Sequence, residues 1–490
     1  MVEEKTAPLD RKARLKLEPQ PIRKRPPAER VRDWDEIYIP WDLKTARLEA
    51  ERCLGCPAAP CTKACPLGNA IPSAMALLQS GDVIGAAQKF RETSPMPEMC
   101  SRLCPRDRQC ENACVLAKSS ARAGAIGCVE AFVTDYQRQN GGVPLPECAP
   151  STGKKVAVIG AGPAGLTVAE EMARRGHACT VFDAWPEPGG LLLYGIPTFK
   201  MSKSIVDEKI DFLRRLGVEF VPNTRLGDGM SIDDLFAKGF DAVFLGYGAT
   251  KVTALKIAGE GSNGEYKMDG AELKGVYQSI DFLVRANVPP ERLPADMRRP
   301  IEIGKRVAVI GGGDTAMDCL RTALRLGAEQ ATCIYRRTEA EMPVRAGEFR
   351  NTKAEGAQFH FLVAPLRLIG DADKHVRKIE CQRMKLGEPD ESGRRRPVPV
   401  EGSEFLVDAD TVVLALGFGV DEAVSEACTG VDADKWGQVL VDEETRTTSR
   451  PGVFAAGDCE HGADLVVTAI RDAKRAAAGI HSFLVGEKAN

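Results

Sequence analysis

Residues 154–184 read KKVAVIGAGPAGLTVAEEMARRGHACTVFDA, and this stretch decides the fold of most of the chain. A short apolar run is followed by a glycine-rich turn, an amphipathic helical pattern and a second apolar run. Gly160 permits a tight turn, Gly162 lets the backbone approach a pyrophosphate, and Gly165 allows the helix to pack closely on the sheet. This order of elements is typical of a parallel sheet that binds a dinucleotide at a helix N-terminus.

An acidic residue follows this turn at the distance expected for an adenosine ribose. Asp183 ends the second apolar run, about 20 residues beyond the glycines. Its carboxylate can accept hydrogen bonds from the hydroxyls of a ribose without a 2′-phosphate. We therefore expect FAD or NAD at this turn, with a purely structural glycine turn as the alternative.

Residues 305–337 repeat the same order of elements as KRVAVIGGGDTAMDCLRTALRLGAEQATCIYRR. Two glycines again stand at the turn, and Ala316 takes the place of the third. Two arginines replace the acid after the second apolar run, and a guanidinium suits a 2′-phosphate better than a ribose hydroxyl. The stretch therefore predicts NADPH, with a solvated arginine pair as the alternative. The residues expected at this nucleotide are Gly311, Gly313, Asp314, Thr315, Arg336 and Arg337.

Residues 452–477, GVFAAGDCEHGADLVVTAIRDAKRAA, place an apolar strand before Gly457 and Asp458 and a helix after them. This arrangement resembles the motif that closes the flavin site of two-dinucleotide flavoproteins, in which the aspartate meets the ribityl chain. We therefore expect an α/β protein whose FAD domain is split in the sequence by an inserted NADPH domain. The domains expected are a helical domain over residues 1–148, a FAD domain in two parts over 149–286 and 421–490, and an NADPH domain over 287–420.

Ten of the sixteen cysteines stand before residue 150, eight of them in two short stretches. These stretches read CLGCPAAPCTKACP over residues 53–66 and CSRLCPRDRQCENAC over residues 100–114. The first residues of the chain carry no apolar core of a signal peptide, so we expect a cytoplasmic protein whose thiols stay reduced. Metal binding by thiolates is then the leading interpretation of the two stretches.

The cysteines beyond residue 150 form no CxxC or CxxxxC pair that could accept electrons from a flavin. An iron-sulfur chain is the other outlet for these electrons. Proline follows Cys65 and Cys104, as in ferredoxins with two clusters, where the cysteine before proline ligates the other cluster. Crossed ligation is therefore expected. Tetrahedral zinc is the competing hypothesis, although only Cys53 and Cys56 form the CxxC unit typical of zinc sites.

The composition argues against several other classes of function. The chain has 490 residues, a formal net charge of -3 and 6% aromatic residues, so neither a broad basic face nor stacking platforms indicate nucleic-acid binding. No apolar run reaches the roughly 18 residues of a membrane helix. A basic stretch over residues 16–32, KLEPQPIRKRPPAERVR, precedes the cysteines, and it is either a solvated arm or a docking element.

Several motifs together resemble one family of flavin and iron-sulfur oxidoreductases. They are RCLGCPAAPCTKACPLGNAIP, CSRLCPRDRQCENAC, AVIGAGPAGL, GGLLLYGIPTFKM, GGGDTAMDC, YRRTEAEMP, LALGF and VFAAGD. From about residue 30 to its end, the chain is similar to the small subunits of bacterial NADPH-dependent glutamate synthase. Its neighbours include the N-terminal part of dihydropyrimidine dehydrogenase and the large subunit of NADH-dependent ferredoxin:NADP oxidoreductase. The resemblance implies a helical N-terminal iron-sulfur domain before two Rossmann-like domains.

The resemblance also implies ligands for two 4Fe-4S clusters. For the fourth ligand of the second cluster, the residues by themselves favour Cys100, and Cys128 stays open, whereas the family has a Glu or Gln there. The implied ligands are Cys53, Cys56, Cys61 and Cys114 for the first cluster and Cys65, Cys104, Cys110 and Glu130 for the second.

The residues expected at FAD combine the first turn, the GGLLLYGIP motif and the C-terminal motif. The family usually has a tryptophan at the position of Thr468. These residues are Gly160, Gly162, Pro163, Ala164, Gly165, Asp183, Gly190, Leu191, Gly195, Ile196, Gly457, Asp458 and Thr468.

The function expected is electron input, from NADPH to FAD, then through two 4Fe-4S clusters to a partner. Placement of the nicotinamide against the flavin requires no general acid or nucleophile. The resemblance implies that the partner is the large, FMN- and glutaminase-bearing glutamate synthase subunit, because nothing in this chain resembles those parts. The alternatives are another acceptor, such as ferredoxin, sulfur or a different FMN enzyme, and a non-enzymatic zinc and nucleotide sensor.

Overall fold

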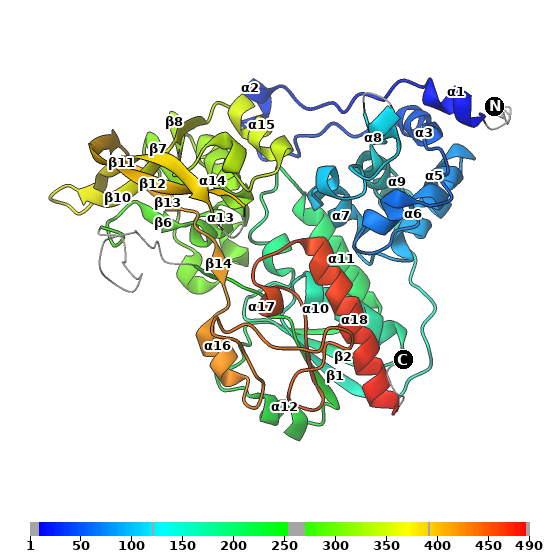
Figure 1. Cartoon of the computed structure of the whole chain (residues 1–490). Helices are drawn as coiled ribbons and strands as arrows, with labels where there is room; N and C mark the ends of the chain where they lie inside the picture. The colour runs from blue at the N-terminus through cyan, green and yellow to red at the C-terminus, as the bar shows by residue number, and fades with distance from the viewer. Residues whose placement is uncertain (1–8, 120–121, 253–269, 391–392, 487–490) are drawn as a thin grey trace.

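The computed structural model describes residues 9–119, 122–252, 270–390 and 393–486 (Figure 1). They form a helical N-terminal unit and two units with central parallel sheets, so the predicted fold class is confirmed. Among these residues, no helix combines the length and the apolar character needed to cross a membrane.

The N-terminal unit is a bundle of short helices. Aspartates cap three of them, because the side chains of Asp10, Asp42 and Asp82 accept hydrogen bonds from first-turn amides. The longest helix buries an apolar face that includes Val129 and Val133, and Phe90 lies in the same core. The helices are α1 (Arg11–Leu15), α2 (Pro27–Arg30), α3 (Leu43–Glu51), α4 (Pro60–Ala64), α5 (Ile71–Gln79), α6 (Val83–Arg91), α7 (Pro97–Leu103), α8 (Leu116–Ser119) and α9 (Ile126–Gln139).

The first sheet has five parallel strands in the order β15-β4-β1-β2-β3. β15 comes from the C-terminal part of the chain and pairs with β4, so this unit is split in the sequence as expected. Its strands are β1 (Lys155–Ile159), β2 (Ala178–Phe182), β3 (Glu219–Val221), β4 (Ala242–Leu245) and β15 (Val453–Ala455). Its helices are α10 (Pro163–Arg174), α11 (Lys203–Arg215), α12 (Ile232–Ala237), α16 (Glu422–Ala427), α17 (Asp458–His461) and α18 (Val466–Val485).

The second sheet has five parallel strands in the order β6-β13-β7-β8-β9. Its strands are β6 (Val276–Gln278), β7 (Arg306–Ile310), β8 (Gln330–Tyr335), β9 (Gln358–Phe361) and β13 (Thr411–Leu414), with the helices α13 (Ser279–Asn287), α14 (Asp314–Arg325) and α15 (Ala346–Ala354). Beside it lies an antiparallel sheet of β10 (Val363–Gly370), β11 (Val376–Pro389) and β12 (Arg395–Asp408).

The connection between the two sheets lies earlier in the chain than the expected boundary at residue 287. β6 and all of α13 except its last residue precede that boundary, yet β6 pairs with β13 of the second sheet. The two crossings between the units pair with each other as β5 (Lys251–Val252) and β14 (Phe418–Gly419). Hydrogen bonding of β6 in the sheet therefore assigns this strand to the second unit.

Residues 17–42, here called the N-terminal arm, connect all three units (Figure 1). Arg30 is buried, and its Nε donates to Glu355 Oε1 at 2.8 Å in the second sheet unit. Lys24 Nζ donates to Asn351 Oδ1 at 2.8 Å in the same unit. Ile37 N donates to the carbonyl of Phe199 in the first sheet unit at 3.1 Å. The basic stretch is therefore not a purely solvated arm, because Lys24 and Arg30 bind the second sheet unit.

Candidate cofactor sites

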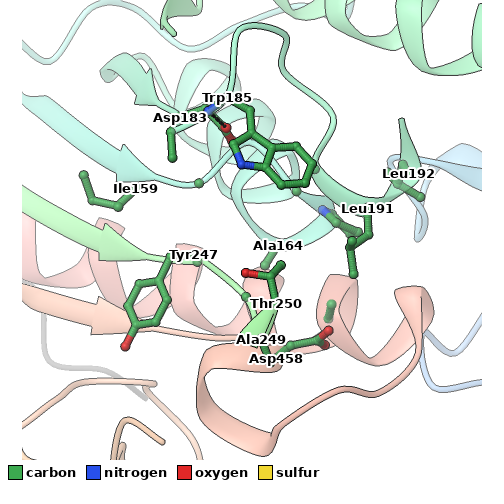
Figure 2. Close-up of a pocket in the computed structure, with 18 of the residues that line it drawn as sticks. Ile159, Ala164, Asp183, Trp185, Leu191, Leu192, Tyr247, Ala249, Thr250 and Asp458 are labelled. Atoms are coloured by element: carbon green, nitrogen blue, oxygen red, sulfur yellow. Dashed lines mark hydrogen bonds between the residues drawn. The ribbon is translucent and has the colours of Figure 1, made fainter. Parts of the chain in front are cut away.

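A cavity of about 340 Å³ opens where β1, β2 and β4 end and where α10 and α18 begin (Figure 2). This position is the usual ligand site of an open parallel sheet. The residues expected at FAD that line the cavity are Gly160, Gly162, Pro163, Ala164, Asp183, Gly190, Leu191, Ile196 and Asp458.

The glycine turn has the close approaches that the sequence predicts. Gly160 has a φ of +98°, and a Cβ there would lie 2.4 Å from the carbonyl oxygen of Gly246. A Cβ at Gly165 would lie 1.9 Å from the carbonyl oxygen of Gly160. A Cβ at Gly162 would meet nothing within 4 Å, which leaves the space above this residue for a ligand. Gly160 therefore allows close packing of the backbone, whereas Gly162 leaves space for a ligand.

The remaining residues expected at FAD support the cavity from outside its lining. The Thr468 hydroxyl donates to the carbonyl of Leu465 at 2.7 Å, and Leu465 itself lines the cavity. Gly457 has a φ of +87° directly before α17. A Cβ at Gly195 would lie 2.9 Å from the side chain of Leu191. These three residues shape the backbone that carries the lining.

Two carboxylates stand at the cavity. Asp183 Oδ2 accepts from the amide of Ala161 at 2.6 Å, and Oδ1 accepts from the amide of Trp185 at 2.8 Å, while burial raises the pKa of this carboxyl. Burial also raises the pKa of Asp458 to about 7. Asp183 is thus held against the glycine turn, and Asp458 faces the cavity from the opposite side (Figure 2).

The second glycine turn has the same construction. Gly311 has a φ of +145°, and a Cβ there would lie 2.1 Å from the carbonyl oxygen of Ala415. Gly313 caps α14, and Thr315 lies in the first turn of this helix. Asp314 Oδ2 accepts from Arg345 Nε at 2.8 Å, so its carboxylate is engaged within the protein.

The two arginines after β8 lie in different surroundings. Arg337 is buried, and it donates to Asp390 Oδ2 at 2.6 Å and to the carbonyl of Arg395 at 2.9 Å. Arg336 is exposed at the end of the strand. Arg337 would have to leave its ion pair with Asp390 to bind a nucleotide phosphate, whereas the guanidinium of Arg336 is accessible without such a change.

The structure brings Cys114 to the first group of cysteines, here called the first thiol set: Cys53, Cys56, Cys61 and Cys114. All four line one small cavity with apolar neighbours that include Ile71 and Met75. Burial and the neighbouring thiols raise the pKa of Cys61 to about 11. Such a thiol ionises readily only when a cation lies beside it, as in a metal site.

The second thiol set is Cys65, Cys104, Cys110 and Glu130. Glu130 is buried, and desolvation with the nearby Cys100 raises its pKa well above the usual range. Burial raises the pKa of Cys65 and of Cys110, and the charge of Glu130 raises both further. The free thiols of Cys100 and Cys104 share a hydrogen bond, whereas Cys128 lines a different cavity beside Arg106. The structure therefore groups Glu130 and Cys100, but not Cys128, with these three thiols.

The four cysteines of the first thiol set surround one shared cavity. Four thiolates are the usual donor set of a 4Fe-4S cluster. This arrangement fits a group of several atoms, such as a 4Fe-4S cluster.

Comparison with known proteins agrees with both parts of this description. Residues 30–142 match the family described as dihydropyrimidine dehydrogenase domain II, 4Fe-4S cluster. Residues 154–473 match the family described as pyridine nucleotide-disulphide oxidoreductase, which covers more than half of the chain. The chain belongs to the pyridine nucleotide-disulphide oxidoreductases.

Individual relatives of this oxidoreductase extend over nearly its whole length. It is 39% identical to the glutamate synthase [NADPH] small chain of Escherichia coli, over 94% of this chain and 96% of that one. It is 41% identical to the corresponding chain of Halomonas elongata, over 94% and 95%. It is also 41% identical to the putative oxidoreductase AegA of Escherichia coli, over 92% of this chain and 67% of that one.

Among solved structures, FprA of Mycobacterium tuberculosis in complex with NADPH superposes with a TM-score of 0.56. The match has 20% identity and covers 69% of this chain and 85% of that one, so it shows the fold alone. Together, the matches confirm the prediction of an NADPH-dependent oxidoreductase with FAD and 4Fe-4S cofactors.

Sequence reasoning missed several residues of the flavin cavity in this oxidoreductase. Trp185 stands edge-on to Tyr194 at a ring distance of 4.3 Å and lines the cavity two residues after Asp183. Its lining also includes Thr224, Arg225 and Leu226, which follow β3. The rule that ligands lie at the carboxyl ends of parallel strands could have indicated this segment.

Proposed function

We propose that this oxidoreductase takes electrons from NADPH and delivers them to the large, FMN- and glutaminase-bearing chain of glutamate synthase. The observation that carries the proposal is the match to glutamate synthase small chains over 94% of this chain. The cofactors supplied by the family fit the cavity at the first glycine turn and the two thiol sets. A cytoplasmic location is part of the proposal, because the thiol sets need reduced cysteines.

The residues of the first sheet unit bind and orient the flavin in this proposal. Gly160 forms the tight turn, and Gly162 leaves the N-terminus of α10 open to the pyrophosphate. Asp183 accepts from the ribose hydroxyls, and Asp458 faces the ribityl chain. Leu191 and Ile196 exclude water from the cavity. When bound, FAD supplies the chemistry that converts a two-electron hydride from NADPH into single electrons. No protein acid or base is required for this transfer.

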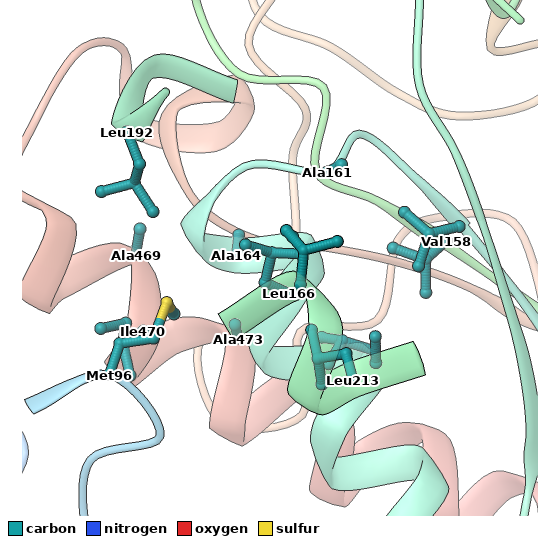
Figure 3. Close-up of a cluster of buried hydrophobic side chains, with 14 of the residues drawn as sticks. Met96, Val158, Ala161, Ala164, Leu166, Leu192, Leu213, Ala469, Ile470 and Ala473 are labelled. Atoms are coloured by element: carbon teal, nitrogen blue, oxygen red, sulfur yellow. The ribbon is translucent and has the colours of Figure 1, made fainter. Parts of the chain in front are cut away.

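The second thiol set lies on the side of the helical unit that faces the flavin cavity. Met96, Met99, Cys100 and Leu103 are buried in one continuous apolar core with Val158, Ala164 and Ala469 of the flavin unit. Figure 3 shows Met96 beside Ile470 and Ala469, at the beginning of α18. Cys104 packs against the same core. The contact supports a route for electrons from the flavin unit into the helical unit.

A second candidate function has a different electron acceptor. The chain is as similar to the putative oxidoreductases AegA and UacF of Escherichia coli as to the small chains, at 41% and 40% identity. It is also 37% identical to a subunit named NADPH-Fe(3+) oxidoreductase subunit beta of Geobacter sulfurreducens. Electron input is common to both candidates, and the acceptor distinguishes them.

The test uses the purified full chain with its iron, sulfide and flavin contents measured. We expect NADPH oxidation with artificial acceptors by the chain alone, and glutamate from glutamine and 2-oxoglutarate only after the large chain is added. Glutamate formation by the chain alone would contradict the proposal. NADPH oxidation that reduces a ferredoxin but never supports the large chain would favour the second candidate. Bound zinc with no NADPH oxidation would contradict both.

A further inference from the structure

The two thiol sets differ in what surrounds them. In the second thiol set Cys110 and Glu130 are buried and Cys65 and Cys104 are partly buried, and Cys104 packs against the core shared with the flavin unit. The four thiols of the first set are only partly buried, and Gly55, Pro57 and Ala58 in the loop around Cys56 are exposed. Electrons that enter from the flavin unit therefore meet the second thiol set first and the surface last.

Helix α1 lies directly against the first thiol set. Arg14 Nη1 donates to the carbonyl of Cys53 at 2.8 Å and to the carbonyl of Glu51 at 3.2 Å. These bonds attach α1 to the end of α3, and Figure 1 shows the two helices together at the outer end of the helical unit. The surface over the first thiol set is thus made partly by α1.

The exposed side chains of this surface are basic and apolar. We call it the α1 face. It consists of Arg11, Lys12, Leu15 and Lys16 in and after α1, together with Lys63, two residues after Cys61, and Lys118, four residues after Cys114, and all six are exposed. Within the described chain, none of its five basic residues forms an ion pair. The acids nearby are Asp10, whose carboxylate caps α1, the exposed Glu18 and the half-buried Glu51 at the end of α3. Leu15, the last residue of α1, is 42% exposed between these charged residues in the sequence.

We propose that the α1 face is the docking surface for the electron-accepting partner, and that this partner presents an acidic surface with an apolar centre. This inference rests on the proposed function, because it names where the electrons leave. A chain with a net charge of -3 concentrates unpaired cations over its outermost thiol set, and such a field steers an acidic protein toward that point. The apolar Leu15 then supplies contact area once the partner has arrived.

A charge-reversal variant tests the docking surface. Arg11, Lys12 and Lys16 are changed together to Glu, and the matched control changes the exposed and distant Lys238, Lys378 and Arg299 to Glu. Both variants alter the net charge equally. Binding is measured by sedimentation at low and high salt with two probes, the large glutamate synthase chain and an acidic ferredoxin. Iron and flavin contents and the rate with a neutral quinone check that the electron route is intact.

We expect the α1-face variant to bind at least one probe about tenfold more weakly at low salt, with a smaller salt dependence than the parent chain. The control should stay within about twofold of the parent chain. Unchanged binding by the α1-face variant, or equal losses in both variants, would overturn the inference. So would parent self-association that the variant abolishes, because the face would then serve a second copy.

A second pair of variants addresses the apolar centre. Leu15→Asp should weaken binding and Leu406→Asp, at the distant and 52% exposed Leu406, should not. If the parent chain binds the ferredoxin through the α1 face but not the large chain, the docking surface stands and the proposed acceptor fails. If it binds the large chain and the α1-face variant binds equally well, the acceptor stands and the docking surface fails. Binding to neither probe would overturn the inference.

Discussion

Arg337 Nη2 donates to Asp390 Oδ2 at 2.6 Å, so the second arginine after β8 is tied to the connection between β11 and β12. Arg336, its neighbour in sequence, is exposed. The pair that the sequence marks for a 2′-phosphate is therefore divided between a surface position and a buried ion pair.

This division predicts different effects of the two alanine substitutions. Arg336→Ala should weaken NADPH binding by about 1.5–3 kcal/mol, a tenfold or larger change, and leave NADH binding nearly unchanged, because it removes a charge-assisted contact to the 2′-phosphate. Arg337→Ala should instead lower thermal stability and weaken both nucleotides. Titration of each variant with both nucleotides checks the prediction, and equal losses for Arg336→Ala would contradict it.

The crossed thiol sets predict which cluster each cysteine supports. Cys114→Ser should damage the cluster of Cys53, Cys56 and Cys61, because these four thiols line one cavity. Iron content and EPR spectra of the reduced protein measure this loss. A spectrum that lacks the other cluster instead would show that Cys114 belongs with Cys104 and Cys110. The exposed Cys148→Ser is the control and should leave both clusters intact.

Glu130 predicts a cluster with one ligand that is not a thiolate. Glu130→Ala should alter the EPR spectrum of the second cluster alone, because this buried carboxylate lies among Cys65, Cys104 and Cys110. Cys100→Ser should leave that spectrum nearly unchanged. The reverse result would transfer the ligand role to Cys100, which also lies beside Cys104.

Alanine substitutions at Gly160 and Gly162 should have different effects, one on the stability of the fold and the other on flavin binding. Gly160→Ala should destabilise the fold by about 1–2 kcal/mol or more, because its φ of +98° strains an L-residue and its Cβ would meet the Gly246 carbonyl. Gly162→Ala has room within the protein and should keep its stability but lose flavin affinity. Denaturant unfolding and flavin titration distinguish the two. Equal stability losses would show that Gly162 has no separate role in access.

The lowered pKa of Lys203 predicts that the free energy of unfolding rises with pH. Burial and Arg292 lower its pKa to about 7, and it donates to the carbonyls of Leu192 and Ile196. The unfolded chain, with an ordinary lysine pKa near 10.5, then binds more protons between pH 7 and pH 10.5. Stability should therefore rise through this window, by at most about 1.4 kcal/mol per pH unit from this group.

Denaturant unfolding at pH 7, 8 and 9 measures this slope. Lys203→Met should flatten it, although the variant also loses two hydrogen bonds to carbonyls. Lys238→Met, at an exposed position, is the control and should keep the parent slope. The same slope in Lys203→Met and the parent chain would contradict the assignment.

The sequence by itself determined the features that depend on neighbouring residues. The turn from Gly160 to Gly165, the acid at Asp183 and the repeated turn at Gly311 each form within one strand-turn-helix unit, so their spacing is enough to predict them. The cofactors and the α/β class follow from the same local patterns. The thiol spacings similarly indicated two metal-binding stretches.

Only the tertiary structure decided which distant residues meet. It placed Arg337 on Asp390 rather than at the surface. The local thiol spacings did not place Cys114 beside Cys53 or Glu130 beside Cys65; only the family resemblance implied these two groupings. The tertiary structure also placed Arg30 on Glu355, which turned part of the basic stretch into a buried connection between units. These partners are far apart in the sequence, and burial of the shared cores brings them together. Local spacing carries no information on such contacts, because long-range packing sets which helices and loops lie side by side.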